Sequence, residues 1–321
     1  MSDAVKKFLK TAIPIALGIL LVWYSYSSTS EEDRQNIYKS IRNADLMWVS
    51  ISIFIGILSH FSRAIRWVYL LKPLGYKPKL HNSFLIVLMS YFANILVLRS
   101  GEFLRATALN TYEDIPFEKG FGTIVTERII DVIMLLLIIT IALFLQAEVI
   151  LEILEENGVG LVGSLLVLVA GIFGLIIAIR IIKKSTSTFA VKIKNFLNGM
   201  LDGVLSISKM KNKTAFIFHT LFIWFCYIAM FWIIKFTVLE TINLPVGAFL
   251  VAFVAGAFAM ATTNGGLGFF PIAVGAALTV YGVSENSGKA YGWIMWTAQT
   301  LMVVVFGAIS FVLLPLLNRK Q

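Results

Sequence analysis

The chain has 321 residues, of which 58% are hydrophobic and 14% charged, and its mean hydropathy is +0.85. Soluble domains are about half apolar and about a quarter charged, so this composition excludes an ordinary soluble protein. The formal net charge of +9 would suggest a nucleic-acid partner for a soluble chain. Here the basic residues cluster in short loops beside apolar stretches, so we expect a bilayer partner and no nucleic acid. A single cysteine and three scattered histidines predict no disulfide framework, metal site or cofactor.

Six apolar stretches are candidates for full spans of a bilayer, whose hydrocarbon core of about 30 Å requires about 20 helical residues. In chain order they cover residues 13–27, 48–71, 123–145, 161–182, 216–239 and 291–317. The first follows three lysines, a pattern that a signal peptide also shows. Because the residues after it form a poor cleavage site, we predict a membrane anchor.

Two further apolar regions are interrupted. The first, 83–109, is broken by polar residues and a glycine at 99–102, and the second, 248–281, is broken at 262–268. Each half is short for a full span, and non-helical backbone at membrane depth persists only where protein or a wet cavity surrounds it. Both regions are therefore predicted to be re-entrant or broken helical hairpins that enter and leave on the same side.

The distribution of Lys and Arg predicts the orientation. With a cytoplasmic N-terminus, this layout puts seventeen of the 27 basic residues on the cytoplasmic side and leaves five within the membrane region. Five lie outside: Arg34, Lys39, Arg42, Lys235 and Lys289. Cytoplasmic loops carry the excess of Lys and Arg. We therefore expect a prokaryotic-type cytoplasmic (inner) membrane protein with both termini in the cytoplasm.

The layout also contains an internal repeat. Segments 47–146 and 213–317 each consist of a span, an interrupted region and a second span. Three spans separate their starts, so the segments run in opposite directions; such inverted repeats place a binding site near the midplane of secondary transporters. Between them, 186–208 alternates lysines with apolar residues and is predicted to be an amphipathic connector on the lipid surface, or a solvated connector helix. The predicted fold is a single all-α polytopic membrane domain, 1–321.

Eight ionisable residues fall within the predicted membrane region: Arg63, Arg66, Arg99, Glu102, Arg105, Glu127, Arg128 and Asp131. Charges at membrane depth are costly and mark functional sites. Five arginines outnumber three carboxylates, which suits an anionic headgroup because guanidinium groups bind phosphate bidentately. Two alternatives stay open: Arg63 and Arg66 reach the cytoplasmic interface, or the charges form structural salt bridges. Gly101, at the first break, is expected to let the chain turn and a headgroup approach its backbone.

The second break carries no charge. Thr263 and Asn264 offer a hydroxyl and an amide, and Gly265, Gly266 and Gly268 expose backbone N–H groups. A helix that starts after them would direct its positive N-terminal end at a bound anion. A flexible turn between helices is the alternative.

Three motifs together resemble a known family. They are Asn94-x4-Arg99-Ser100-Gly101-Glu102-x2-Arg105, Glu127-Arg128-x2-Asp131 and Asn264-Gly265-Gly266-Leu267-Gly268. In order and spacing they are similar to the lysylphosphatidylglycerol synthase transmembrane-domain family, also called flippase-like domain proteins, over roughly residues 10 to 315. That family usually has a proline before the first arginine and at the position of Asn264, which this chain lacks.

The resemblance implies a function. In that family the membrane domain is often a separate protein; when fused to an aminoacyl-transferase domain, it moves the aminoacylated lipid between leaflets. We recognise no such domain here and expect no lysyltransferase activity. The sequence thus predicts a transporter that moves an anionic phospholipid or a polyprenyl-phosphate-linked lipid between leaflets, with no catalytic residue. The alternatives are a membrane-embedded transferase with Glu102, Glu127 or Asp131 as general base, and a non-catalytic scaffold for a separate lipid-modifying enzyme.

Overall fold

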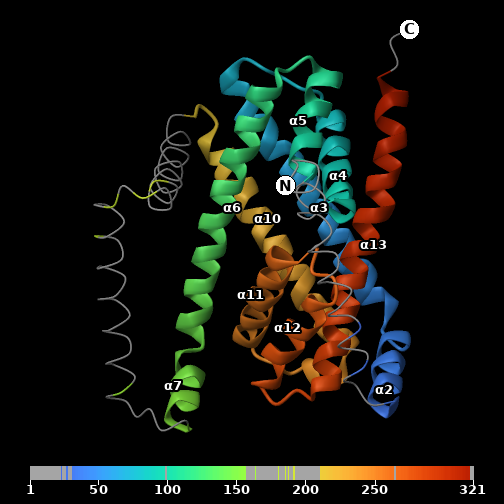
Figure 1. Ribbon diagram of the computed structural model, residues 1–321, viewed down its shortest axis with the longest axis vertical. Helices are drawn as coiled ribbons and strands as arrows, with labels where there is room; N and C mark the ends of the chain where they lie inside the picture. The colour runs from blue at the N-terminus through green and yellow to red at the C-terminus, as the bar shows by residue number, and fades with distance from the viewer. Residues whose placement is uncertain are drawn as a thin grey trace. The chain divides into compact units, whose positions relative to one another are not determined.

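The computed structural model describes residues 31–97, 100–156, 210–263 and 265–318, together with positions 23, 27, 163, 180, 185, 187 and 191 (Figure 1). These residues form helices joined by short turns, and none of them belongs to a β-strand. Arg99 and Asn264 lie outside the described residues, as do nearly all of the predicted spans 13–27 and 161–182 and the predicted connector 186–208.

Four described helices are long and apolar enough to cross a membrane, which confirms four of the six predicted spans by length and composition. They are α3 (Leu46–Leu71, continued by the 3-10 turn η1, Lys72–Leu74), α6 (Phe117–Leu145), α10 (Lys213–Ile233, continued by η2, Ile234–Thr237) and α13 (Glu285–Leu317). The start of α13 differs from the prediction, because polar residues at 285–290 resemble a loop. Ser284 caps this helix: its hydroxyl accepts a hydrogen bond from the backbone N–H of Ser287 at 3.4 Å.

The chain divides into two compact units. Unit 1 comprises Met1–Val125 and Lys211–Gln321, and unit 2 comprises Thr126–Met210. Helix α6 begins in unit 1 and continues into unit 2, where α7 (Ala147–Glu156) follows it. The remaining described helices belong to unit 1.

Within unit 1, α3 packs along α10, and α13 packs against α12, α4, α3 and the amphipathic helix α2 (Glu31–Arg42). The approach of α12 to α13 is close enough to require glycine. A Cβ added at Gly292 would lie 2.6 Å from Cα of Pro271. Small residues bring helix backbones together in this way inside membranes, where helix association depends on close packing.

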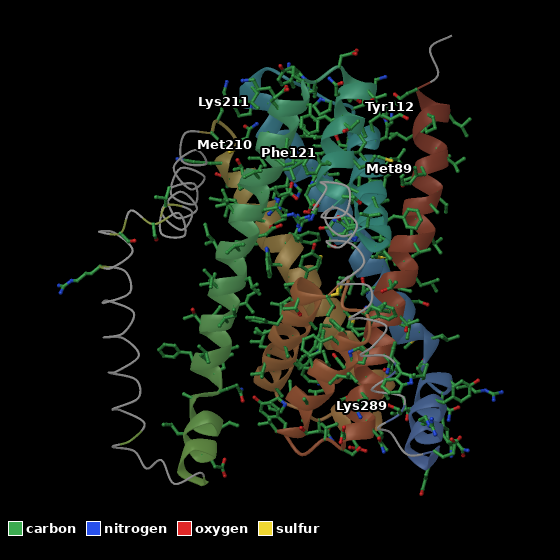
Figure 2. The ribbon with its side chains drawn as sticks, viewed as in Figure 1. Met89, Tyr112, Phe121, Met210, Lys211 and Lys289 are labelled. Carbon is green, nitrogen blue, oxygen red and sulfur yellow. The ribbon has the colours of Figure 1, made fainter. Side chains whose placement is uncertain are left out.

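The two interrupted regions form pairs of shorter helices. The first pair is α4 (Leu80–Leu96) and α5 (Ser100–Glu113), and the second is α11 (Val246–Thr262) and α12 (Phe269–Thr279). In Figure 1, α4 and α5 lie in the upper half of unit 1 and α11 and α12 in the lower half. Figure 2 marks these two ends by Tyr112, in α5, and Lys289, in the first turns of α13.

In each helix pair, residues near the start of the first helix and near the end of the second are joined by hydrogen bonds to a carboxylate, Glu113 in the first pair and Glu240 in the second. Glu113, at the end of α5, accepts hydrogen bonds from the backbone N–H of Lys79 (3.1 Å) and from Nδ2 of Asn82 (2.6 Å), at the start of α4. Glu240, in η3 (Leu239–Thr241) just before α11, accepts from the N–H of Ser284 (2.7 Å), which follows α12. Each pair therefore begins and ends on the same side, as the hairpin prediction requires. The inverted repeat itself stays a prediction.

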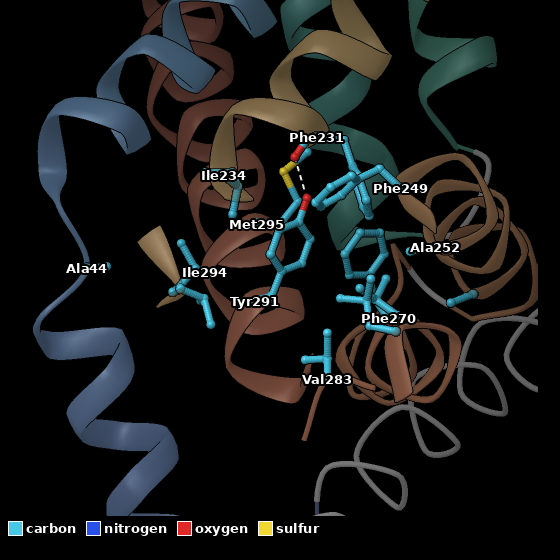
Figure 3. Close-up of a cluster of buried hydrophobic side chains, with 14 residues drawn as sticks. Ala44, Phe231, Ile234, Phe249, Ala252, Phe270, Val283, Tyr291, Ile294 and Met295 are labelled. Carbon is cyan, nitrogen blue, oxygen red and sulfur yellow. Dashed lines mark hydrogen bonds between the residues drawn. The ribbon is translucent and has the colours of Figure 1, made fainter. Parts of the chain in front are cut away.

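An aromatic core joins the helices of the lower half. Phe231, Phe249, Phe270 and Tyr291 come from α10, α11, α12 and α13 and are almost fully buried (Figure 3). The Tyr291 hydroxyl donates a hydrogen bond to the Phe231 carbonyl, so its polar atom is satisfied within the core. This core fixes the second helix pair against α10 and α13.

Candidate functional site

Three of the predicted arginines are enclosed in unit 1. Arg63 and Arg66 lie on α3 and Arg105 on α5, with exposed fractions of 1%, 0% and 2%. Arg63 and Arg66 are three residues apart and so share one helix face. Protein therefore encloses both guanidinium groups.

Arg63 is held between two tyrosines. Its Nη2 donates to the Tyr227 hydroxyl on α10 at 2.9 Å, and its guanidinium carbon lies 5.8 Å from the centre of the Tyr91 ring on α4. His60, one turn earlier on α3 and also buried, packs its ring 4.6 Å from the same Tyr91 ring. Arg63 therefore lies where α3, α4 and α10 meet.

Arg66 faces α10 as well. Its Nη1 is 3.4 Å from Oγ1 of Thr220, a long hydrogen bond, and its guanidinium carbon is 5.8 Å from the Phe216 ring centre. The Thr220 hydroxyl donates in turn to the Phe216 carbonyl at 2.9 Å, which fixes its rotamer. The contact orients Arg66 through a neutral hydroxyl.

Arg105 stacks on a tryptophan of α3. Its guanidinium carbon lies 3.9 Å from the centre of the Trp67 ring. The ring is itself fixed, because Trp67 Nε1 donates to Oγ1 of Thr123 at 2.9 Å and that hydroxyl donates to the Gly120 carbonyl at 2.7 Å. A desolvated cation–π contact of this kind contributes about 2 kcal/mol.

These contacts share one electrostatic property. Each guanidinium group is buried and contacts a neutral hydroxyl group or a ring face. A buried cation in low-dielectric surroundings interacts strongly with any anion that reaches it. The arrangement of Arg63, Arg66 and Arg105 is therefore chemically suited to an anionic group.

The first break differs from its predicted form at Gly101. This residue lies inside the first turn of α5, and the bend of the chain comes from Val97, in an extended conformation. A Cβ at Gly101 would lie 2.0 Å from the Ser90 carbonyl oxygen, and the Gly101 N–H donates to Oδ1 of Asn94 at 2.8 Å. Gly101 and Asn94 thus pack and cap α5 against α4, whereas the sequence suggested a turn open to a headgroup. Glu102 follows, half-buried, one helical turn before Arg105.

The described residues of the second break, 262–263 and 265–268, turn the chain between α11 and α12. Gly265, Gly266 and Gly268 have φ angles of 65°, 79° and 72°, which favour glycine. Trp296 on α13 donates from Nε1 to the Gly265 carbonyl at 2.7 Å, and buried Thr263 donates to the Ala259 carbonyl at 2.8 Å. These bonds connect the break to α13 and to the end of α11. Helix α12 begins immediately after Gly268, as predicted.

The predicted residues of unit 2 lie on α6. Glu127 is fully buried, and Arg128 pairs with Asp131, with 3.8 Å between Nη1 and Oδ2. This ion pair joins neighbouring turns of one helix. In the part of the chain that the structure describes, no group of three or more His, Cys, Asp or Glu side chains is placed to hold a metal ion.

Sequence reasoning missed the aromatic partners of the arginines. Trp67 carries a local signal, since it adjoins Arg66 and lies one turn after Arg63 on the same helix. Tyr227 carries none, because 164 residues separate it from Arg63. Lys235 was counted among the basic residues outside the membrane, and the structure buries it in η2 with 7% of its surface exposed.

Comparison with known proteins identifies the family. The profile described as lysylphosphatidylglycerol synthase TM region matches residues 11–308. The chain belongs to this family. It is an integral membrane protein, in agreement with the resemblance drawn from the three motifs.

Two curated relatives align over shorter stretches. The UPF0104 membrane protein MJ1595 of Methanocaldococcus jannaschii is 35% identical over 98 residues, which cover 30% of this chain and 29% of the relative. Glycosyltransferase AglD of Haloferax volcanii is 27% identical over 123 residues, covering 38% of this chain and 20% of that protein. The aligned stretches thus span less than a third of either relative. No solved structure matches the chain.

Proposed function

We propose that the protein binds the phosphate of an anionic membrane lipid, either a phospholipid or a polyprenyl-phosphate-linked lipid, and moves it between leaflets. The observation that carries this proposal is the enclosure of Arg63, Arg66 and Arg105 in a bundle of apolar helices. Ionisable side chains at membrane depth are rare and mark the paths of substrates and ions.

The geometry of the arginines supports a phosphate ligand. A guanidinium group offers a planar fork of N–H donors that pairs with two phosphate oxygens at once. Tyr227 and Trp67 orient the groups of Arg63 and Arg105 before any ligand arrives. Preorganisation reduces the entropy lost on binding and so favours affinity.

The two helix pairs support movement of the lipid in addition to binding. They open toward opposite ends of unit 1 (Figure 1), which agrees with the predicted inverted repeat of segments 47–146 and 213–317. In secondary transporters, discontinuous helices in matching positions flank a midplane site. On this proposal, the N–H groups around Gly265, Gly266 and Gly268 offer a second, uncharged contact for the headgroup. Arg99, Asn264, Glu127, Arg128 and Asp131 stay sequence-based candidates for the same function.

The orientation belongs to the same proposal. Lys211, at the start of α10, lies at the end of unit 1 that Tyr112 marks, and Lys289 lies at the other (Figure 2). The lysines of η1 and of the turn before α4 share the Lys211 end in the predicted layout. We therefore place this end in the cytoplasm and the protein in a prokaryotic-type inner membrane.

Movement of a fluorescent phosphatidylglycerol in reconstituted vesicles tests the proposal. A membrane-impermeant quencher reports how fast the lipid reaches the outer leaflet. Removing one guanidinium–phosphate contact costs about 1.5–3 kcal/mol, so Arg63→Gln and Arg105→Gln should each slow lipid movement about tenfold or more. Arg42→Gln is the matched control, because Arg42 is exposed at the end of α2.

Thermal unfolding of each purified variant must accompany the assay, because these arginines are buried. Wild-type rates in folded Arg63→Gln and Arg105→Gln proteins would refute the headgroup role. Those rates would instead favour the scaffold alternative, in which the buried charges only hold helices together.

A second candidate follows from the similarity to a protein named as a glycosyltransferase. In that case the arginines would hold a lipid-linked phosphate for a separate sugar-transferring enzyme, without moving it between leaflets. The same vesicles separate the candidates: binding of the lipid that depends on Arg105, without any movement, would favour this second role.

A further inference from the structure

Lys235 is a buried cation outside the arginine cluster. It lies in η2, directly after α10, and only 7% of its surface is exposed. The η3 turn is hydrogen-bonded to the Lys235 backbone, because Oγ1 of Thr241 donates to the Lys235 carbonyl at 2.8 Å. The backbone of this lysine is therefore fixed at the end of a membrane span.

Aromatic rings surround its ammonium group. Nζ lies 3.8 Å from the Trp232 ring centre, 5.3 Å from that of Phe236 and 5.6 Å from that of Phe249. Trp48 of α3 stacks on Phe236 with 4.5 Å between ring centres, and Phe249 belongs to the core of Figure 3. Ring faces attract the cation but accept none of its three hydrogen bonds in the ordinary geometry.

The neighbouring acidic groups have other partners. Glu240 accepts hydrogen bonds from Ser284 and Ser287, and Glu285 pairs with Lys289 at 2.6 Å. Among the residues that the structure describes, none accepts a hydrogen bond from Lys235 Nζ, and none brings a carboxylate oxygen within 4 Å of it. A buried ammonium group is costly without an acceptor, so these surroundings favour an anion at Nζ.

The position of Lys235 along α10 and η2 indicates which anion can reach its ammonium group. Lys235 follows Lys213 by 22 positions, a helical rise of about 33 Å, roughly the thickness of the hydrocarbon core. With Lys213 at one boundary, Lys235 lies at the other, at the level of lipid phosphates. Trp side chains such as Trp48 and Trp232 are typical of this level.

We propose that Lys235 and its aromatic enclosure bind the phosphate of a phospholipid in the leaflet on the Glu240 side of the protein. The ammonium group donates to the phosphate oxygens, and Trp232, Phe236 and Trp48 contact the glycerol and the first methylenes of the acyl chains. The site does not depend on the proposed transport, because Tyr227, the α10 contact of Arg63, lies eight residues earlier, about 12 Å along the helix.

Binding of fluorescent phosphatidylglycerol to the purified protein in uncharged detergent tests this site. Lys235→Met should weaken binding about tenfold or more, whereas Lys235→Arg should retain it. Lys289→Met is the matched control, because that lysine lies at the same end and already has Glu285 as its partner. The loss should appear equally in the wild-type and Arg63→Gln backgrounds, so a failure of the transport proposal leaves this test intact.

Three results would overturn the assignment. Equal affinity of Lys235→Met and wild type would do so, as would equal binding of phosphatidylglycerol and of diacylglycerol, which has the same chains without phosphate. Displacement by inorganic phosphate at a comparable concentration would assign the site to a soluble anion.

If Lys235→Met fails to fold, the wild type still provides a test. Phosphatidylglycerol should slow the acetylation of Lys235 by acetic anhydride, measured by peptide mass spectrometry, and leave Lys289 unaffected. An unchanged rate at Lys235 would refute the proposal.

Discussion

Gly101→Ala should destabilise the protein strongly, although alanine is the better helix former. An alanine in a helix interior is favoured over glycine by up to about 1 kcal/mol. Against this gain, the added Cβ would lie 2.0 Å from the Ser90 carbonyl oxygen and 2.8 Å from Cγ of Asn94. A backbone carbonyl within α4 has no rotamer by which to move aside, so α5 must move away from α4.

The magnitude follows from the two contacts that this displacement affects. Overpacking costs about 1–3 kcal/mol. Lengthening the 2.8 Å bond from Gly101 N–H to Asn94 weakens the cap of α5, which contributes about 1 kcal/mol more. After the gain in helix propensity is subtracted, the free energy of unfolding should fall by about 1–3 kcal/mol.

Reversible unfolding in mixed micelles with increasing SDS measures this difference. Gly122→Ala is the matched control, because Gly122 is helical in α6 and a Cβ there would meet nothing within 4 Å. It should be neutral or slightly stabilising. Ser90→Ala should not rescue Gly101→Ala, because the clash involves the carbonyl of Ser90 and not its side chain. A Gly101→Ala protein as stable as the wild type would refute the close approach of α4 and α5.

Two further predictions concern the second helix pair. Gly266→Ala should cost more stability than Gly265→Ala in the same SDS assay. Both glycines have positive φ, but only at Gly266 would the new Cβ also meet Sδ of Met260, at 2.7 Å. Equal losses of stability would contradict the packing of Gly266 against Met260. The hydrogen bond from Ser287, aided by those from Ser284, lowers the pKa of Glu240 below 4.5. The carboxylate therefore stabilises the fold above the unfolded-state pKa, and this contribution is lost as the pH falls through the lower folded-state pKa. Thermal unfolding between pH 6 and 3 should show a smaller pH dependence for Glu240→Gln than for the wild type. An unchanged profile would contradict the stabilising role of the Glu240 hydrogen bonds to Ser284 and Ser287.

The spans and the interruptions could be predicted from the sequence because both depend on local composition. A run of about 20 apolar residues specifies a span whatever it packs against. The glycines at 265–268 indicated the second break, since positive φ is a local property. The start of α13 was missed because Ser284 caps a first turn of polar residues, which composition alone does not distinguish from a loop.

The contacts of the charged residues could not be predicted in the same way. That Arg63 meets Tyr227 and Arg105 meets Trp67 depends on how α3, α5 and α10 pack. Local sequence does not distinguish Gly101, which packs against α4, from Gly265, which turns the chain. Lys235 was counted as lying outside the membrane, and the sequence did not indicate that aromatic rings surround its ammonium group.

The positions of these groups bear on how a charged headgroup crosses the apolar bundle. Lys235 lies at one boundary, and Arg63 reaches Tyr227 about 12 Å further along α10. Trp296, which binds the Gly265 carbonyl, lies five residues after the start of the predicted span 291–317, so the loop lies about 8 Å into that span. A phosphate that passes between two cations through hydrocarbon alone would lose nearly all of its solvation. On the transport proposal, the backbone N–H groups of the glycine loop would offer donors to such a headgroup. This gives the uncharged second helix pair a role that its composition alone does not explain.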